Sequence, residues 1–286
     1  MKKFLGSIVL AGLLVTNALA VDAKTESISN NAVKKAEANA KVDNKIIKEA
    51  IRAIRYTNDA YIYLNRKNTK RALESLKKAI AELTVLLNTP NAPYLLPISV
   101  NIEATEYVGT IDNIAKEVEK AKEALSENKL PLTRDILNTL KSEIDIHTIN
   151  LPLATYPNAI KLAIRYVNEG KIENAKDIIA LTLNSLVNVD TIIPIPILKA
   201  QELIKAASKA KKEQALKELE EAKRQLRIAQ LLGYTSTSDT TYVELNKAIN
   251  KIEDRIKGNR STKSLFDELK QKIEDFKEKA ISILHK

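Results

Sequence analysis

The sequence predicts an all-α protein, and three observations lead to this prediction. Gly (6) and Pro (8) are scarce among the 286 residues, whereas Ala, Leu, Ile, Lys and Glu dominate, a balance that favours helices over a turn-rich β fold. The 44% of hydrophobic residues suffice for a real core. Apolar residues also recur at helical spacing along most of the chain. We therefore expect an irregular bundle of repeated antiparallel helical hairpins with proline-rich connectors.

Residues 1–20 have the pattern of a secretory signal peptide. Lys2 and Lys3 precede an apolar run over 4–15, and Ala18-Leu19-Ala20 supplies small residues for cleavage after Ala20. The run is shorter than the roughly 20 residues that span a bilayer, so an uncleaved anchor is the less favoured alternative. This pattern predicts a periplasmic protein with no transmembrane span in the mature chain.

After the signal peptide, the polar residues 21–30 are expected to form a flexible leader, followed by one helical domain over 31–286. The first helix is expected over 31–65, where an apolar stripe is interrupted but recurrent. Within the domain, the sequence allows a sub-boundary near 145–150.

The clearest element is a helical hairpin over 151–186. Apolar residues recur at helical spacing on both sides of Gly170, which suits the left-handed position that ends a helix. Two amphipathic helices joined so tightly must pack antiparallel. Pro152 and Pro157 introduce the first helix, and the small side chain of Ala175 lets the second approach it closely.

The same pattern recurs twice before this hairpin. A hairpin that lies about 103 residues earlier in the chain aligns with this one, and a weaker third copy aligns with it from about 42 residues earlier. Because the spacing is irregular, a compact bundle is favoured over a strict solenoid. The first alignment pairs Ala60 with Ala163, Leu64 with Val167, Ala72 with Ala175 and Leu76 with Ile179, and the second pairs Ala121 with Ala163 and Leu137 with Ile179.

The connectors and the last third complete the prediction. The proline-rich segments 89–98, 151–157 and 191–198 suit extended, buried connectors, and short β pairing there stays open. Pro131 is expected to start a helix that runs to about Ile146. From Pro194 the helical pattern continues to Gly233, with a kink or break near 211–214, and helices follow to the end of the chain.

Charge and cysteine content exclude several classes of function. The chain has no Cys, so disulfides, thiolate metal sites and a Cys nucleophile are excluded. The net charge of +10 favours anionic partners, although a solvated basic surface is the simpler reading. The basic clusters Lys209-Lys211-Lys212 and Arg224-Arg227 lack interleaved aromatic residues, which argues against nucleic-acid binding.

Motifs for catalysis are missing from the sequence. It contains no phosphate loop, no G-x-S-x-G and no H-E-x-x-H, so we expect no catalytic residues, no metal and no cofactor. Glu143 and His147, with Asp145 between them, lie four apart near the expected helix end and could titrate near neutral pH or bind a metal. A single imidazole makes a poor metal site, so a local hydrogen bond is the favoured interpretation.

Tyrosines supply the candidate ligand residues, which are Tyr56, Tyr63, Tyr156 and Tyr166. A cleft lined by several tyrosines could accept an aromatic or amphipathic ligand by stacking and phenol hydrogen bonds. With no Trp and three Phe in the chain, tyrosine is also the main aromatic residue available for a core, so core packing is the favoured alternative.

Three segments resemble the YfdX family of exported bacterial proteins: LPLATYPNAIKLAIRYVNEGKIENA (151–175), PIPILKAQELI (194–204) and LEEAKRQLRIAQLLGY (219–234). NDAYIYLNRKNTKRALESLKKA (58–79) is similar to the family's first hairpin, except that Lys67-Asn68 stands where a glycine turn is expected. The resemblance implies an α-helical, periplasmic, oligomeric protein associated with acid and multidrug stress. It implies no catalytic residue set.

These observations lead to a functional hypothesis and two alternatives. The leading hypothesis is a non-enzymatic periplasmic stress-associated protein that binds a partner protein or an amphipathic small molecule, and that forms a homo-oligomer. The first alternative is a basic envelope-surface binder of anionic lipid or polymer. The second alternative, a hydrolase or metal enzyme, would depend on His147.

Overall fold

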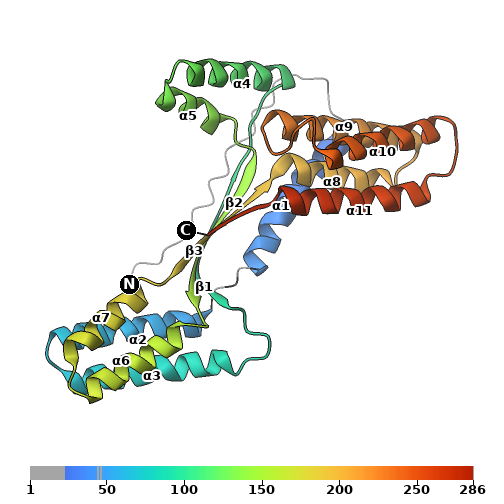
Figure 1. Ribbon diagram of the computed structural model, residues 1–286. Helices are drawn as coiled ribbons and strands as arrows, with labels where there is room; N and C mark the ends of the chain where they lie inside the picture. The colour runs from blue at the N-terminus through green and yellow to red at the C-terminus, as the bar shows by residue number, and fades with distance from the viewer. Residues whose placement is uncertain (1–22, 44, 46, 286) are drawn as a thin grey trace. The chain divides into compact units, whose positions relative to one another are not determined.

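The computed structural model describes residues 23–43, 45 and 47–285 of the 286-residue chain (Figure 1). Over these residues the protein is mostly helical, with eleven helices and four β-strands. The helical character is confirmed, but the prediction of an all-α fold is wrong because the chain also forms a β-sheet. The predicted signal peptide, residues 1–20, lies outside the described residues.

The sheet has the strand order β1-β2-β3-β4, so each strand pairs with the next along the chain. Hydrogen bonds at two positions show antiparallel pairing: Leu153 N donates to Tyr94 O over 2.8 Å, and Ile195 N donates to Ser142 O over 2.9 Å. β1, β2 and β3 overlap the three proline-rich segments that were expected to be extended. The strands are β1 (Leu95–Thr105), β2 (Glu143–Pro152), β3 (Val187–Pro194) and β4 (Ser282–His285).

Strand β2 corrects the prediction of a helix from Pro131 to Ile146. That helix, α5 (Leu130–Thr139), stops before the segment EIDIHTIN, in which apolar and polar residues alternate. The side chains follow the alternation, since Ile144 and Ile146 are buried whereas His147 is exposed. A period of two residues is the signature of a strand, and it overrides the helical spacing read across 137 and 144.

The chain divides into two compact units, whose first boundary falls near the end of α1 (Ala23–Asp43) and whose other boundaries each fall within a strand. Unit 1 comprises the described residues of 1–40, 102–145 and 191–283. Unit 2 comprises the described residues of 41–101, 146–190 and 284–286. One boundary, between Asp145 and Ile146, lies in the range 145–150, where the sequence allows a sub-boundary.

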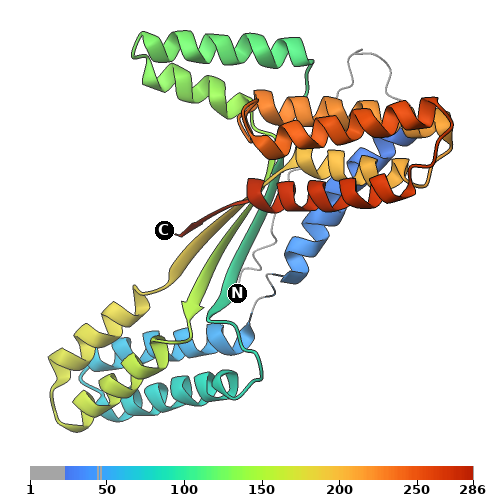
Figure 2. The ribbon, with the colours of Figure 1, turned by 45° about the vertical axis from the view of Figure 1, so that its right-hand side comes forward.

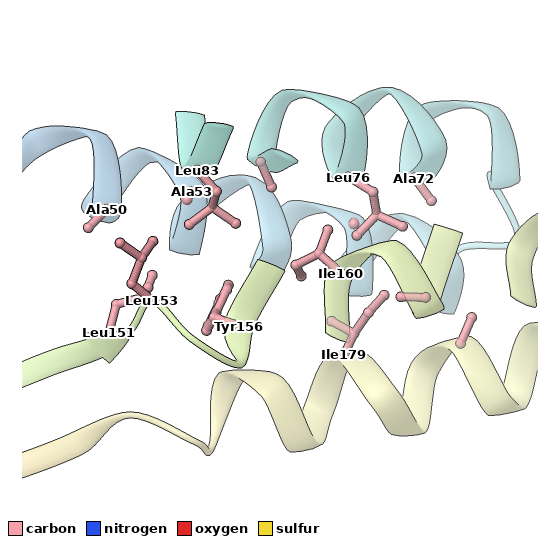
Figure 3. Packing of buried hydrophobic residues seen from close by; sticks show 14 of the residues in the cluster. Ala50, Ala53, Ala72, Leu76, Leu83, Leu151, Leu153, Tyr156, Ile160 and Ile179 are labelled. Carbon is pink, nitrogen blue, oxygen red and sulfur yellow. The ribbon is translucent and has the colours of Figure 1, made fainter. Parts of the chain in front are cut away.

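Unit 2 contains four helices that form two hairpins. α2 (Lys48–Asn65) packs against α3 (Thr69–Leu87), and α6 (Tyr156–Asn168) packs against α7 (Ile172–Leu183). The hairpins also pack on each other, α3 against α6 and α2 against α7. Figure 3 shows Leu76, Ile160 and Ile179, from three different helices, directed into the shared interior.

Alanines make the close approach of these helices possible. Ala60, Ala72, Ala163 and Ala175 are all completely buried. An alanine leaves room for the facing helix, whose bulkier residues then fill the neighbouring space. The predicted packing role of Ala175 agrees with this burial. That the hairpins are copies of one another stays a prediction.

The turns of the two hairpins have the same geometry despite different residues. Gly170 has a φ of +74°, and its counterpart Lys67 has a φ of 58°. In both turns the next amide reaches back across the helix end, from Lys171 N to Tyr166 O and from Asn68 N to Tyr63 O, each over 2.9 Å. This pattern is the Schellman helix cap, so Lys67 occupies a left-handed position that normally favours glycine.

Unit 1 contains the remaining seven described helices, and four of them, α8 to α11, enclose its core. Figure 2 shows these four helices stacked beside one another. The break expected near 211–214 is present, because α8 ends at Ala207 and α9 begins at Lys212. The helices are α1 (Ala23–Asp43), α4 (Ile111–Ser126), α5, α8 (Ile195–Ala207), α9 (Lys212–Leu231), α10 (Thr240–Lys257) and α11 (Lys263–Ala280).

The N-terminal part of the described chain differs from the prediction. Residues 23–30 of the expected flexible leader form the first turns of α1, where Thr25 and Ser29 are buried. The single helix expected over 31–65 is instead two helices, α1 and α2. A search of the described residues found no helix long and apolar enough to cross a membrane.

Candidate functional site

The α4–α5 hairpin carries an unusual number of exposed leucines. Leu125, Leu130, Leu132 and Leu137 are 55%, 53%, 48% and 51% exposed. The two helices lie side by side in both views of the ribbon (Figures 1 and 2). Single exposed apolar residues are common, but a group on one short element marks a candidate binding surface. We call these four residues the hairpin leucine surface.

Local packing explains why these leucines stay exposed. α4 buries Ile114, Ala121 and Ala124 and packs against both α5 and α9. Within α5, Thr133 is the one buried residue. An amphipathic helix normally buries its apolar face. The rest of the described chain therefore covers α4 in part and leaves Leu130, Leu132 and Leu137 of α5 half-exposed.

The turn and the charges around the surface are well ordered. Asn128, with a φ of 58°, takes the left-handed position of the turn, and Lys129 N donates to Ala124 O over 2.9 Å. Neighbouring charges pair within the hairpin, Lys120 with Glu117 at 2.6 Å and Lys122 with Glu119 at 2.7 Å. These exposed pairs add little stability, but they leave a surface whose charges are locally balanced.

The predicted tyrosines lie in unit 2, and the structure gives them two different environments. Tyr56, Tyr63 and Tyr166 are half-buried and pack against the core. A cation lies over each ring, with Arg55 at 5.1 Å from Tyr56, Arg71 at 5.8 Å from Tyr63 and Lys171 at 6.0 Å from Tyr166. Core packing accounts for these contacts, and ligand binding by these tyrosines stays a prediction.

Tyr156 is the fourth candidate and is a core residue with 1% exposure. Its hydroxyl is buried without a hydrogen-bond partner of normal geometry. Burial raises the pKa of the phenol to about 12, although the nearby Thr57 opposes this shift. The Thr57 hydroxyl itself donates to Ala53 O over 2.8 Å. Pro157, in the first turn of α6, is also buried.

Glu143, Asp145 and His147 lie on strand β2 and not, as was expected, near the end of a helix. His147 Nδ1 lies 2.8 Å from Asp190 Oδ1 on β3. Glu143 instead contacts Lys141 Nζ at 3.0 Å and accepts a hydrogen bond from the Tyr234 hydroxyl over 2.8 Å. Among the described residues, no group of acidic residues and histidine has a metal-binding arrangement.

The contacts of Glu143 form a buried polar network that anchors the start of β2. Ser142 N donates to the Tyr234 hydroxyl oxygen over 3.0 Å, and that hydroxyl donates to Glu143. Burial is the main reason why the pKa of Tyr234 lies well above its ordinary value. Because both carboxylate oxygens of Glu143 are engaged, this network suits a structural role better than an acid–base role.

A groove between α10 and α11 is the second candidate site. It has a volume of about 310 Å³ and an apolar floor that contains Ala248 and Leu265. Lys247 and Lys251 lie on one wall, and Lys272 on the other wall pairs with Glu244 at 3.0 Å. Arg224, which belongs to one of the basic clusters noted in the sequence, lies outside this groove and makes two 2.7 Å hydrogen bonds to Glu221.

Sequence reasoning missed the hairpin leucine surface, although a signal was present. The alignment predicts three hairpins, and three hairpins cannot all pair two by two. Leu137 was aligned with Ile179 and was therefore treated as a core position. The odd number of hairpins leaves one without a second hairpin to pair with, and in the structure helix α4 of that hairpin packs against α9 instead.

Comparisons with known proteins agree with the resemblance seen in the sequence. The chain is similar to a solved structure of YfdX from Salmonella Typhi, with 17% identity over 53% of this chain and 94% of that chain and a TM-score of 0.38. No curated protein matched the chain. The family model described as YfdX protein matches residues 53–192, which include most of α2, all of α3, α6 and α7, and the α4–α5 hairpin. Residues 53–192 of the chain therefore match the YfdX family.

Proposed function

We propose that this protein is a non-enzymatic, periplasmic, stress-associated helical protein that acts by binding a partner protein through the hairpin leucine surface. The observation that carries the proposal is the half-exposed state of Leu125, Leu130, Leu132 and Leu137 on one hairpin. Covering the exposed half of a leucine contributes about 1 kcal/mol. Four such residues supply a substantial part of the free energy of a specific protein complex.

The form of the surface favours a protein over a small molecule. The leucines are distributed along two helices, with positions from Leu125 to Leu137, and do not converge on one enclosed point. A helical partner that presents its own apolar stripe would contact several of them at once. The predicted periplasmic location and stress association come from the signal-peptide pattern and the family resemblance, and they form part of the same proposal.

Site-specific cross-linking in cells tests this proposal. A photo-reactive benzoylphenylalanine in place of Leu137 should form a discrete cross-linked protein product. The same residue in place of the exposed Lys116, on the polar side of α4, is the matched control. We expect the product with the first variant and not with the second. Equal labelling at both positions, or no product at either, would contradict the proposal.

The α10–α11 groove supports a second candidate function, binding of anionic lipid or polymer at the envelope surface. Lys247 and Lys251 stand one helical turn apart above an apolar floor, which suits a ligand with an anionic head and an apolar part. Binding through these lysines should weaken between low salt and about 0.15 M, where the screening length is about 8 Å.

Vesicle sedimentation tests this second function. Vesicles that contain phosphatidylglycerol should bind the mature chain at low salt, and the double variant Lys247→Glu/Lys251→Glu should lose most of this binding. Lys209→Glu/Lys211→Glu makes the same charge change at exposed lysines outside the groove and is the control. Salt-independent binding, or equal loss in both double variants, would remove the groove as the site.

A further inference from the structure

The turn that joins α2 to α3 carries a positive charge that no nearby acid balances. Residues 66–71, Arg-Lys-Asn-Thr-Lys-Arg, contain four basic residues and no acidic or apolar residue. We call these six residues the basic turn. All four cationic side chains are exposed, and none of them forms an ion pair among the described residues. Arg71 lies over the ring of Tyr63, 5.8 Å from its centre.

The corresponding turns of the other two hairpins are close to neutral. The predicted alignment places 66–71 on 169–174, which contain two acidic residues and one basic residue, and on 127–132, which contain one of each. In both of these turns the lysine pairs with the nearby glutamate, Lys171 with Glu169 at 2.7 Å and Lys129 with Glu127 at 2.6 Å. A hairpin of this pattern therefore closes without a cluster of cations.

The backbone at Lys67 shows that the lysine does not serve the turn itself. Five helix ends in the described part of the chain have a left-handed residue whose following amide donates back to the helix. Gly or Asn occupies four of them, which are Asn128, Gly170, Gly233 and Asn259. Lys67, with a φ of 58°, is the exception, and a lysine is strained in this conformation. Such strain points to a function of the side chain.

Lys70 and Arg71 are also placed against the preference of the helix. They lie in the first turn of α3, where the helix dipole favours acidic residues and where α3 has none. The helix starts there because Asn68 caps it, with the Asn68 side-chain oxygen accepting from Arg71 N over 3.1 Å. The positive end of the dipole adds to the charge of the cations, so both attract an anion to the same turn.

We propose that the basic turn binds a linear phosphate polymer, of the kind represented by inorganic polyphosphate. The turn is separate from the hairpin leucine surface and from the α10–α11 groove, so this inference goes beyond the proposed function. The ligand is an anion because the four cations have no acidic partner among the described residues. It is a polymer because the cations are distributed over six residues, and phosphates joined in one chain bind such a set at a raised effective concentration.

The chemistry of the basic turn favours a bare phosphate chain over a membrane or a nucleic acid. The turn has no apolar residue that could enter a bilayer. Lys70 and Arg71 are neighbours on a helix and point in directions about 100° apart, so a flexible chain can contact both better than a flat surface can. Tyr63 is half-buried and lies under Arg71, so its ring offers no free face for base stacking.

Fluorescence anisotropy with end-labelled linear polyphosphate tests the proposal on the purified mature chain. We expect binding that weakens from about 0.05 M to about 0.2 M salt, because phosphate contacts release counterions. Arg66→Gln/Lys67→Asn removes two cations and leaves at position 67 a residue that suits the left-handed turn. This double variant should bind about tenfold more weakly, and the slope of log affinity against log salt should fall by about 1 or more.

Lys209→Gln/Lys211→Gln makes the same charge change at exposed lysines elsewhere and should leave the affinity within about twofold. Lys67→Asn alone should weaken binding without lowering the melting temperature, which separates the loss of binding from a loss of folding. No binding, equal loss in both double variants, or an unchanged salt slope in Arg66→Gln/Lys67→Asn would overturn the inference. Tighter binding of a single-stranded oligonucleotide or of phosphatidylglycerol vesicles through Arg66 and Lys67 would overturn it too. Each of these outcomes leaves the test of the hairpin leucine surface unaffected.

Discussion

The paired hairpins of unit 2 and the single α4–α5 hairpin of unit 1 share a predicted sequence pattern but differ in their surroundings. In all three hairpins, small residues between the two helices are buried. Only the unit 2 hairpins bury their outer apolar face, because each covers the other. The pattern thus determines how a hairpin closes on itself, whereas its neighbour determines whether the outer face belongs to a core or stays exposed.

The test with the largest expected effect replaces two aligned leucines, Leu76 and Leu137, by alanine. Leu76→Ala removes a completely buried side chain from unit 2 and should cost about 2–5 kcal/mol of the free energy of unfolding. Leu137→Ala removes a side chain that is 51% exposed and should change stability by less than about 0.5 kcal/mol. Hydrogen exchange, followed peptide by peptide at a low protein concentration, measures both units separately. Similar losses in both variants would show that the two faces are equally buried in solution.

A second test enlarges the small residue at the closed contact within a hairpin. Ala175→Leu should cost about 1–3 kcal/mol by overpacking, because Ala175 is completely buried. Thr133→Leu, at the aligned position of α5, should cost a similar amount, because Thr133 is 7% exposed. Thermal unfolding of both variants checks the prediction. A loss in unit 2 without a loss in α4–α5 would break the comparison, since the helix contact within a hairpin should be alike in both.

Much of the fold could be predicted from the sequence because it depends on local patterns. Helical spacing and the scarcity of Gly and Pro indicated the helices, and Gly170 indicated the turn of its hairpin. The sheet was missed because the alternation in 143–150 is short and follows a helical pattern directly. Strand pairing joins residues far apart in the chain, such as Ser142 and Ile195, and a periodicity within one segment does not report such a partner.

The candidate site was harder to predict than the fold. The tyrosines were selected because aromatic residues often bind ligands, but one of them, Tyr156, is a core residue. Leu125 and Leu137 have the spacing of core residues, and in unit 2 the aligned residues are core residues. The sequence pattern is the same in both cases, so only the tertiary arrangement distinguishes an exposed face from a core.

A third test concerns the Tyr156 hydroxyl, whose burial without a hydrogen-bond partner lowers the stability of unit 2. The offset of 42 places Ile114 of α4 on Tyr156, and both side chains are 1% exposed. Because the Tyr156 hydroxyl has no partner of normal geometry, Tyr156→Phe should raise the stability of unit 2 by about 1–2 kcal/mol. Denaturant unfolding near neutral pH measures this difference. A loss of stability would show that the hydroxyl makes a favourable hydrogen bond in solution.

The raised pKa of Tyr156 also predicts that the stability of unit 2 depends on pH. The pKa of Tyr156 is about 12 in the folded chain, above the ordinary value of 10.0. Between these two values the unfolded chain releases a proton that the folded chain retains, so the stability of unit 2 falls as the pH rises from about 10 to about 12. The fall should be steeper for the wild-type chain than for Tyr156→Phe, which has no phenol to titrate at this position. Parallel curves for the two proteins would contradict the buried state of Tyr156.

The smallest test exchanges the residues at the turns of the two paired hairpins. Lys67→Gly should raise the free energy of unfolding by up to about 1 kcal/mol, because Lys67 has a φ of 58° that glycine adopts without strain. Gly170→Val should lower it by about 1 kcal/mol or more, through backbone strain at a φ of +74°. No atom lies within 4 Å of a Cβ added at Gly170, so the added Cβ itself meets no neighbour. Thermal unfolding of both variants measures the two effects, and a shift of the same sign in both would show that the turns of the paired hairpins differ in solution.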